Sequence, residues 1–284
     1  MVGIGRSVEL IGAAAGLGAP DARVALGPAF LQAAGLGERL GARWTPLLAP
    51  RFAAPRAAAV ADFNRRLARR TAASVAKGAF PLVLGGDHSV AAGTWRGVAG
   101  ALDGSLGLLW IDAHMDAHTV SSSPSGNWHG MPLASLLGAD GSPGALRPEH
   151  VALVGVRSYE PEEAALLARL GVRVFFIDEV QRRGPAAVFE EALGIVARGT
   201  ARFGVTVDLD ALDPADAPGT GLPVADGLRS GDLVPALAAI GTDRRLVAAE
   251  IVEYNPFRDE AGVTARLVES IAGALARPVV APVA

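Results

Sequence analysis

The sequence predicts a three-layer α/β/α fold with a mainly parallel sheet, and two observations lead to this expectation. Short runs rich in leucine and β-branched residues alternate along the chain with longer segments rich in alanine, leucine and arginine. That alternation is typical of a parallel sheet covered by helices on both faces. Several of the longer segments also open with proline, which suits the first turn of a helix.

Seven runs have the length and composition of buried strands. They are residues 8–11, 81–84, 106–111, 151–156, 172–177, 203–209 and 246–252. Helices are expected between them at residues 55–76, 161–170, 185–197, 230–240 and 263–274. The apolar stretch at residues 10–20 contains glycines and runs directly into Asp21, so we interpret it as the end of a first strand and a loop rather than a signal peptide.

Length, composition and charge restrict the classes of function. The 284 residues are 50% hydrophobic and contain no linker-like tract, which predicts a single domain spanning 1–284. The net charge of -3 provides no basic field for nucleic acid or an anionic membrane, so a small-molecule partner is expected. Without cysteine, any metal must be held by oxygen and imidazole, and a reducing cytoplasm fits. No uninterrupted apolar segment approaches the ~18 residues that a membrane span needs, so a soluble cytoplasmic protein is predicted.

A polar segment directly follows the expected strand at 106–111. It places Asp112, His114, Asp116 and His118 at alternate positions. In an extended backbone alternate side chains share one face, so the four can converge on one point. A polar turn whose aspartates cap a following helix is the alternative, but capping does not explain four such residues with a period of two.

Two further strand ends carry similar residues. Asp208 and Asp210 follow the apolar run at 203–207, and His88 follows two glycines after the strand at 81–84. Neighbouring carboxylates repel each other and resist desolvation unless a cation or a proton lies between them. Four of the five histidines, including His129, fall in these strand-end segments, and only His150 stands apart.

The chemistry of this set indicates the metal. Carboxylates outnumber imidazoles, which favours a hard divalent ion such as Mn²⁺ over a soft-ligand zinc site. Aspartates that can bridge suggest two ions. A pair ~3.5–4 Å apart can hold a shared water as hydroxide at neutral pH and stabilise the charge that develops as it attacks.

These segments resemble the motif set of the arginase (ureohydrolase) family, in that family's order. The motifs are GGDHS at 85–89, DAHMD at 112–116, SGNWHGMP at 125–132, VDLDALDP at 207–214 and EYNP at 253–256, and the resemblance runs from about residue 11 to 268. It implies a hydrolase that uses two Mn²⁺ ions per chain. The implied reaction cleaves the guanidino group of L-arginine to urea and L-ornithine through attack of a metal-bridging hydroxide.

The resemblance also implies roles for individual residues. One ion would be held by His88, Asp112, Asp116 and Asp208, and the other by His114, Asp112, Asp208 and Asp210. Asp116 would also accept a proton from the hydroxide and pass it toward the leaving amine. His129 matches the histidine proposed to shuttle protons, and Glu253 matches the glutamate that orients the guanidinium, a role that suits a buried carboxylate facing a planar cation.

The non-reacting end of the substrate is assigned by the same resemblance. Its carboxylate would meet Ser123, Ser125 and Asn127, and its α-amino group would meet Glu160 and Glu163. For the two glutamates the alternative is a helix N-terminus started by Pro161, where acidic residues are favourable.

Three positions depart from the family pattern at this end of the pocket. His118 stands where arginases have asparagine, and we expect its ring to donate to the substrate carboxylate. Leu222 replaces a threonine and Asp226 replaces a glycine. The departures leave the metal residues unchanged, so they bear on substrate choice.

Other functions stay open at this point. A ureohydrolase for 4-guanidinobutanoate or agmatine is one, although agmatine would leave the loop serines without an anionic partner. Histone-deacetylase-like hydrolases would need two adjacent histidines, which this chain lacks. A non-catalytic metal-binding subunit would not need His129 or Glu253. The resemblance also predicts a homo-oligomer, a trimer or a hexamer.

Overall fold

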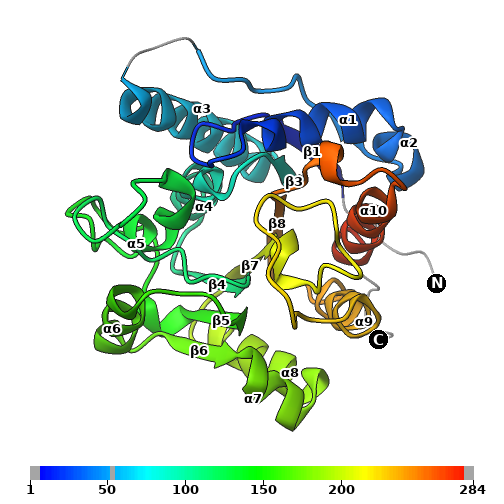
Figure 1. The fold of residues 1–284 in the computed structure, drawn as a ribbon. Helices are drawn as coiled ribbons and strands as arrows, with labels where there is room; N and C mark the ends of the chain where they lie inside the picture. Colours follow the sequence, from blue (N-terminus) through cyan, green and yellow to red (C-terminus); the bar gives the residue numbers. More distant parts are fainter. Residues whose placement is uncertain (1–6, 52–54, 278–284) are drawn as a thin grey trace.

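The strands form one parallel sheet with the order β2-β1-β3-β8-β7-β4-β5-β6 (Figure 1). The computed structural model describes residues 7–51 and 55–277; residues 1–6, 52–54 and 278–284, which the single-domain prediction includes, lie outside the described part. The strands are β1 (Val8–Ala13), β2 (Arg43–Trp44), β3 (Phe80–Gly85), β4 (Leu106–Ile111), β5 (Val151–Val156), β6 (Arg173–Phe176), β7 (Arg202–Asp208) and β8 (Leu246–Val252).

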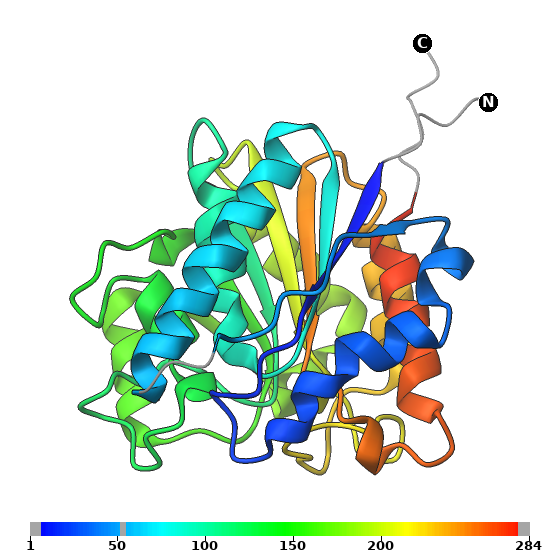
Figure 2. The same cartoon turned by 90° about the horizontal axis from the view of Figure 1, so that it is seen from above.

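Helices cover both faces of the sheet, as Figures 1 and 2 show, which confirms the predicted three layers. One face carries α3 (Arg56–Ala76), α4 (Ala91–Gly100), α5 (Pro132–Leu136) and α6 (Pro161–Leu170). The other carries α1 (Gly27–Ala33), α2 (Leu36–Leu40), α7 (Ile177–Arg183), α8 (Pro185–Val196), α9 (Ser230–Ile240) and α10 (Val263–Leu275). Among the described residues, no helix has both the length and the apolar character needed to cross a membrane.

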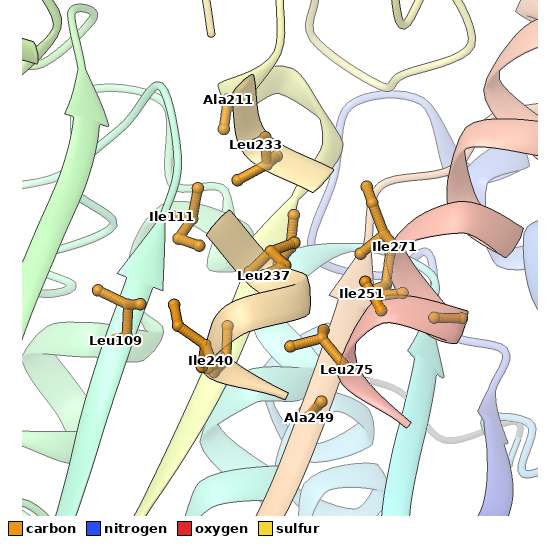
Figure 3. Packing of buried hydrophobic residues seen from close by; sticks show 14 of the residues in the cluster. Leu109, Ile111, Ala211, Leu233, Leu237, Ile240, Ala249, Ile251, Ile271 and Leu275 are labelled. Carbon is orange, nitrogen blue, oxygen red and sulfur yellow. The ribbon is translucent and has the colours of Figure 1, made fainter. Parts of the chain in front are cut away.

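The inner strands are apolar along their whole length because both of their faces are covered. Every residue of β3, β4 and β5 is buried. Figure 3 shows one of the two interfaces, where Leu237 and Ile240 of α9 and Ile271 of α10 pack on Leu109 of β4 and Ile251 of β8. At ~25 cal/mol for each square ångström of apolar surface buried, such contacts provide most of the stabilisation of the fold.

Most of the predicted elements are confirmed, with ends that shift by a residue or two. The strands β4, β5 and β8 and the helices α6 and α9 have the predicted bounds. The helix α4 was missed because its sequence contains three glycines, which disfavour helices. Its Gly93 permits close contact with α3, since a Cβ atom there would lie 2.7 Å from the carbonyl oxygen of Asn64.

The order of the strands determines where the polar residues gather. The four central strands are β3, β8, β7 and β4, and each lies beside the next. Ligands of open parallel sheets bind outside the carboxyl ends of the strands. Residues that follow these four strands, although far apart in sequence, therefore share one rim of the sheet.

Candidate active site

Three aspartates surround one nitrogen of His88 at this rim. The Nδ1 atom of His88 lies 2.9 Å from Oδ2 of Asp116 and 3.1 Å from Oδ2 of both Asp112 and Asp208. All four residues are 5% exposed or less. The residues that follow β3, β4 and β7 thus meet at a single buried point.

A second group adjoins the first and shares Asp112 with it. The Nδ1 atom of His114 lies 3.1 Å from Oδ2 of Asp210 and 3.5 Å from Oδ1 of Asp112. Ligand atoms of Asp112, His114 and Asp210 lie within 4.8 Å of one another, and the same holds for His88, Asp112 and Asp116. Asp112 therefore contributes one oxygen to each group.

The residues fit divalent metal ions. Nδ1 of His88 and Oδ2 of Asp116 are buried and lack a hydrogen-bond partner among the described residues, although they lie close together. Burial raises the pKa of Asp208 well above its usual value, and the charges of Asp210 and Asp112 raise it further. Burial and the charge of Asp112 raise the pKa of Asp116 to about 6. A bound cation would satisfy the open atoms and offset this repulsion.

The aspartates also stabilise the turns that carry them. Oδ1 of Asp112 accepts the backbone N–H of His114 at 2.7 Å, and Oδ1 of Asp208 accepts that of Asp210 at 3.0 Å. Asp208 is thereby the N-cap of the short helix η5 (Leu209–Ala211). The capping alternative is thus partly correct: Oδ1 of each aspartate fixes the turn, and Oδ2 of each faces Nδ1 of His88.

Neighbouring groups fix the ring of His88. Its Nε2 atom lies 3.2 Å from Oγ1 of Thr206, whose hydroxyl donates to Glu250. Thr94 also donates to Glu250, which is completely buried in β8. On the other side, the indole of Trp110 stacks on the imidazole at 4.4 Å and donates its N–H to Oδ2 of Asp112 at 2.8 Å. Such outer contacts orient metal ligands.

Glu253 lies beside the cluster and retains one free oxygen. Its Oε1 atom accepts the backbone N–H of His88 at 3.0 Å and lies 3.3 Å from Nδ1 of His129. Its Oε2 atom is buried and has no hydrogen-bond partner in the described part of the chain. Gly221 lies against this carboxylate, and a Cβ atom at that position would overlap Oε2.

Two of these acidic residues have a strained backbone. Asp116 has a φ of 50° and Glu253 a φ of 66°, in the left-handed region that residues other than glycine seldom adopt. Each such residue costs on the order of 1–3 kcal/mol, and such strain concentrates at functional sites. Both strained residues contact His88 at the rim that carries the cluster.

Comparison with known proteins agrees with this geometry. The sequence model of the arginase family matches residues 8–276. The chain belongs to the arginase family. The arginase of Bacillus caldovelox is 41% identical over 225 residues, which cover 76% of this chain and 75% of the relative. Like its relatives, the protein is an enzyme that hydrolyses a C–N bond of a linear amidine.

Solved structures of arginases have the same fold. The structure of the B. caldovelox arginase superposes with a TM-score of 0.89 at 36% identity and covers 95% of this chain and 98% of its own. An arginase of Entamoeba histolytica, solved in complex with L-ornithine, superposes with a TM-score of 0.89 at 28% identity and covers 96% of this chain and 98% of its own.

His118, which the sequence predicted to contact the substrate carboxylate, has partners that the sequence did not reveal. Its Nε2 atom lies 3.0 Å from Oε2 of Glu160 and 3.5 Å from Oε2 of Glu163. Its Nδ1 atom lies 3.1 Å from the hydroxyl of Ser122. The helix N-terminus that was the alternative for the glutamates is present, because they form a capping box at the start of α6. Their contact with a substrate α-amino group stays a prediction.

The other residues predicted for the substrate lie in a more open loop. Ser123 accepts the backbone N–H of Gly126 at 3.0 Å, and Ser125 accepts that of Asn127 at 3.2 Å. These bonds shape the loop before η3 (Trp128–Gly130), the short helix that carries His129. Binding of a substrate carboxylate by this loop stays a prediction. Leu222 and Asp226 lie in a different loop, between η5 and α9, where Leu222 is 37% exposed and Asp226 has a φ of 60°.

The sequence did not reveal five residues that position the site residues through hydrogen bonds or stacking. They are Asp87, Trp110, Arg157, Thr206 and Glu250. Asp87 is buried and accepts the backbone N–H groups of Gly18 and Ser89, and Gly18 in turn accepts the N–H of His129. The available signal was a charged or polar residue inside or directly after an apolar strand run, as with Thr206 and Glu250.

Proposed function

We propose that the protein hydrolyses the guanidino group of L-arginine to urea and L-ornithine with two Mn²⁺ ions bound. The free oxygen of Glu253 carries this proposal. A buried carboxylate atom beside a metal-binding cluster suits a planar cation with several N–H donors. The names of the arginase relatives, and the L-ornithine bound to one of them, support arginine as the substrate.

The residues divide into two overlapping ligand sets. His88, Asp112, Asp116 and Asp208 would hold one ion, and His114, Asp112, Asp208 and Asp210 the other. The excess of carboxylate over imidazole favours Mn²⁺. When bound, such ions would lower the pKa of a water molecule and offset negative charge at the reacting carbon.

The side chains have distinct tasks in the reaction. Glu253 binds and orients the guanidinium through Oε2, while Oε1 is held by the backbone of His88. Asp116 lies in the ligand set beside His88, and its carboxylate would accept a proton from the attacking water and return it to the leaving amine. His129 is partly exposed and exchanges protons between the site and solvent.

Urea release from a panel of guanidino compounds tests the proposal. We expect Mn²⁺-dependent release that is fastest with L-arginine when agmatine and 4-guanidinobutanoate are the competitors. Glu253→Gln, which keeps shape and removes charge, should lower kcat/KM for arginine by about 100-fold or more. Glu260→Gln, at an exposed position of the same region, is the matched control.

4-Guanidinobutanoate is the second candidate substrate. It lacks the α-amino group, and His118 already contacts both glutamates that would bind that group. Faster turnover of this compound than of arginine by the unmodified protein would make 4-guanidinobutanoate the proposed substrate in place of arginine.

We also propose that the chain assembles as a trimer or hexamer in the cytoplasm and forms one domain. The exposed side chains of Leu26, Phe30 and Phe257 line one apolar pocket on the surface, and such a patch favours association. Light scattering that gave a monomer at micromolar concentration would contradict the assembly.

A further inference from the structure

His118 lies beside the metal cluster in a fixed position. It follows Asp116 by two residues, and its backbone N–H donates to the carbonyl of Gly130 at 3.0 Å. Its side chain is only 7% exposed. Nδ1 lies 3.1 Å from the hydroxyl of Ser122, and Nε2 faces a carboxylate of Glu160, which accepts, so Nε2 carries the N–H in this contact. The ring is therefore a donor that is already in place before any ligand arrives.

Glu163 is held just as firmly by backbone groups. Its Oε1 atom accepts the N–H of Ala117 at 2.9 Å, and its Oε2 atom accepts the N–H of Glu160 at 3.0 Å. Ala117 is the residue between Asp116 and His118, so this contact joins the N-terminus of α6 directly to the metal cluster. Glu160 has a half-exposed side chain whose Oε2 atom reaches His118.

Two carboxylates at the rim of a substrate site would ordinarily bind a cationic group such as an ammonium. Here Nε2 of His118 already faces Oε2 of both glutamates. An incoming ammonium must displace or share these contacts, so it gains little compared with binding to free carboxylates. The ring and the glutamates belong to one chain, so forming their contact costs no translational or rotational freedom. Binding of a free ammonium compound to the same glutamates does cost such freedom.

We propose that His118 is a specificity-determining residue that occupies the carboxylates of Glu160 and Glu163, so that the site accepts ω-guanidino acids without an α-amino group. This inference rests on the proposed function. The preferred substrate class then extends from arginine to its amino-free analogues, provided that the chain length and the carboxylate are kept.

The test compares L-arginine with 5-guanidinopentanoate, which differ only in the α-amino group. For the unmodified Mn²⁺-loaded protein, we expect the two kcat/KM values to lie within about threefold of each other. In His118→Ala the ratio should change at least about tenfold in favour of arginine, through KM more than kcat, because the contact is similar in ground and transition states. His118→Asn is the second variant and should shift the ratio in the same direction.

His150→Ala is the matched control, since His150 is the histidine outside the site, and it should leave the ratio unchanged. A ratio that stayed the same in both His118 variants, or an unmodified protein that preferred arginine by 100-fold, would overturn the inference. Loss of a bound Mn²⁺ ion in His118→Ala would also overturn it, because the cluster would then be a metal site.

A binding measurement separates this inference from the proposed function. L-Ornithine and 5-aminopentanoate differ in the same α-amino group, and calorimetry with the Mn²⁺-loaded protein gives their Kd values without turnover. If neither guanidino compound released urea, the proposed function would fail. The ratio of the two Kd values, and its change in His118→Ala, would still decide whether His118 keeps the two glutamates from binding an α-amino group.

Discussion

At the scale of single residues, two carboxylates of the cluster both fix a backbone turn and face the cluster. Asp112 and Asp208 use one oxygen to fix a backbone turn and present the other to the cluster. Asp116 reaches it with a strained backbone. Function at this site therefore depends on side chains that are held by their own turns rather than by long-range packing alone.

Removal of one shared carboxylate should disable the site. We expect Asp208→Ala to lower the bound Mn²⁺ from about two ions to one or fewer per chain and to reduce urea release by at least about 100-fold, because Asp208 is proposed to bridge both ions. Elemental analysis of the purified protein together with the urea assay measures both effects. Asp232→Ala, on the exposed first turn of α9, is the control. Two ions and a near-normal rate in Asp208→Ala would refute the shared-ligand assignment.

The indole of Trp110 should matter through its N–H group. Trp110→Phe keeps an aromatic ring against His88 but removes the donor to Asp112, so metal affinity or kcat should fall by about 10- to 100-fold. Trp44→Phe makes the same change where the indole N–H has no hydrogen-bond partner among the described residues. Titration with Mn²⁺ and the kcat at saturating Mn²⁺ distinguish the two variants, and equal changes in both quantities would show that the hydrogen bond is unimportant.

At the scale of elements, the segment that follows β7 is held by one guanidinium group. Arg157, just after β5, donates to backbone carbonyls on this segment and its own strand. The acceptors are Gly155, Asp210, Ala211, Leu212, Val224 and Ala225. Burial lowers the pKa of Arg157, although the charge of Asp210 partly opposes this. The group thereby positions the turn that presents Asp210.

Loss of this guanidinium should destabilise the fold and weaken one metal group. Arg157→Met should lower the free energy of unfolding by about 3 kcal/mol, since several buried carbonyls lose their donor. For a chain of this size that corresponds to a decrease in Tm of about 6 °C or more. Arg169→Met, on an exposed position of α6, should change Tm by much less. Equal Tm values for the two variants, measured by calorimetry, would contradict this role.

At the scale of the whole molecule, the cluster joins strands that lie at the centre of the sheet. His88 follows β3, Asp112 follows β4 and Asp208 ends β7. These strands also contribute side chains to the two largest clusters of buried hydrophobic residues. Burial raises the pKa of Asp208 and of Asp210, and the negative charge of Asp112 raises both further, so the carboxylates repel one another within the folded state. Metal binding should therefore stabilise the whole fold and not only the rim.

Removal of metal should lower the thermal stability of the protein. Bound Mn²⁺ at 100 times its Kd adds about 2.7 kcal/mol to the folded state, so chelation should decrease Tm by about 5 °C or more. Scanning calorimetry with chelator and with added Mn²⁺ gives the difference, and Mg²⁺ at the same concentration tests selectivity. An unchanged Tm would mean that metal binding at the cluster does not stabilise the fold.

The sequence by itself determined the class of fold, most of the strands and the residue types of the metal cluster. Continuous apolar runs predict buried parallel strands because helices cover both faces of such a sheet, and polar residues directly after those runs are costly unless they have a function. Short elements such as β2 and the glycine-rich α4 were missed because they are specified by their packing partners and not by their own composition.

Only the tertiary structure decided which strand ends meet. β7 and β8 come late in the chain, yet they lie between β3 and β4, so the partners of His88 could not be deduced from spacing. The same holds for His118, whose sequence position suggests a contact with substrate but whose ring faces Glu160 and Glu163. Residues far apart in sequence acquire such contacts through strand order and helix packing. A local sequence pattern does not determine either.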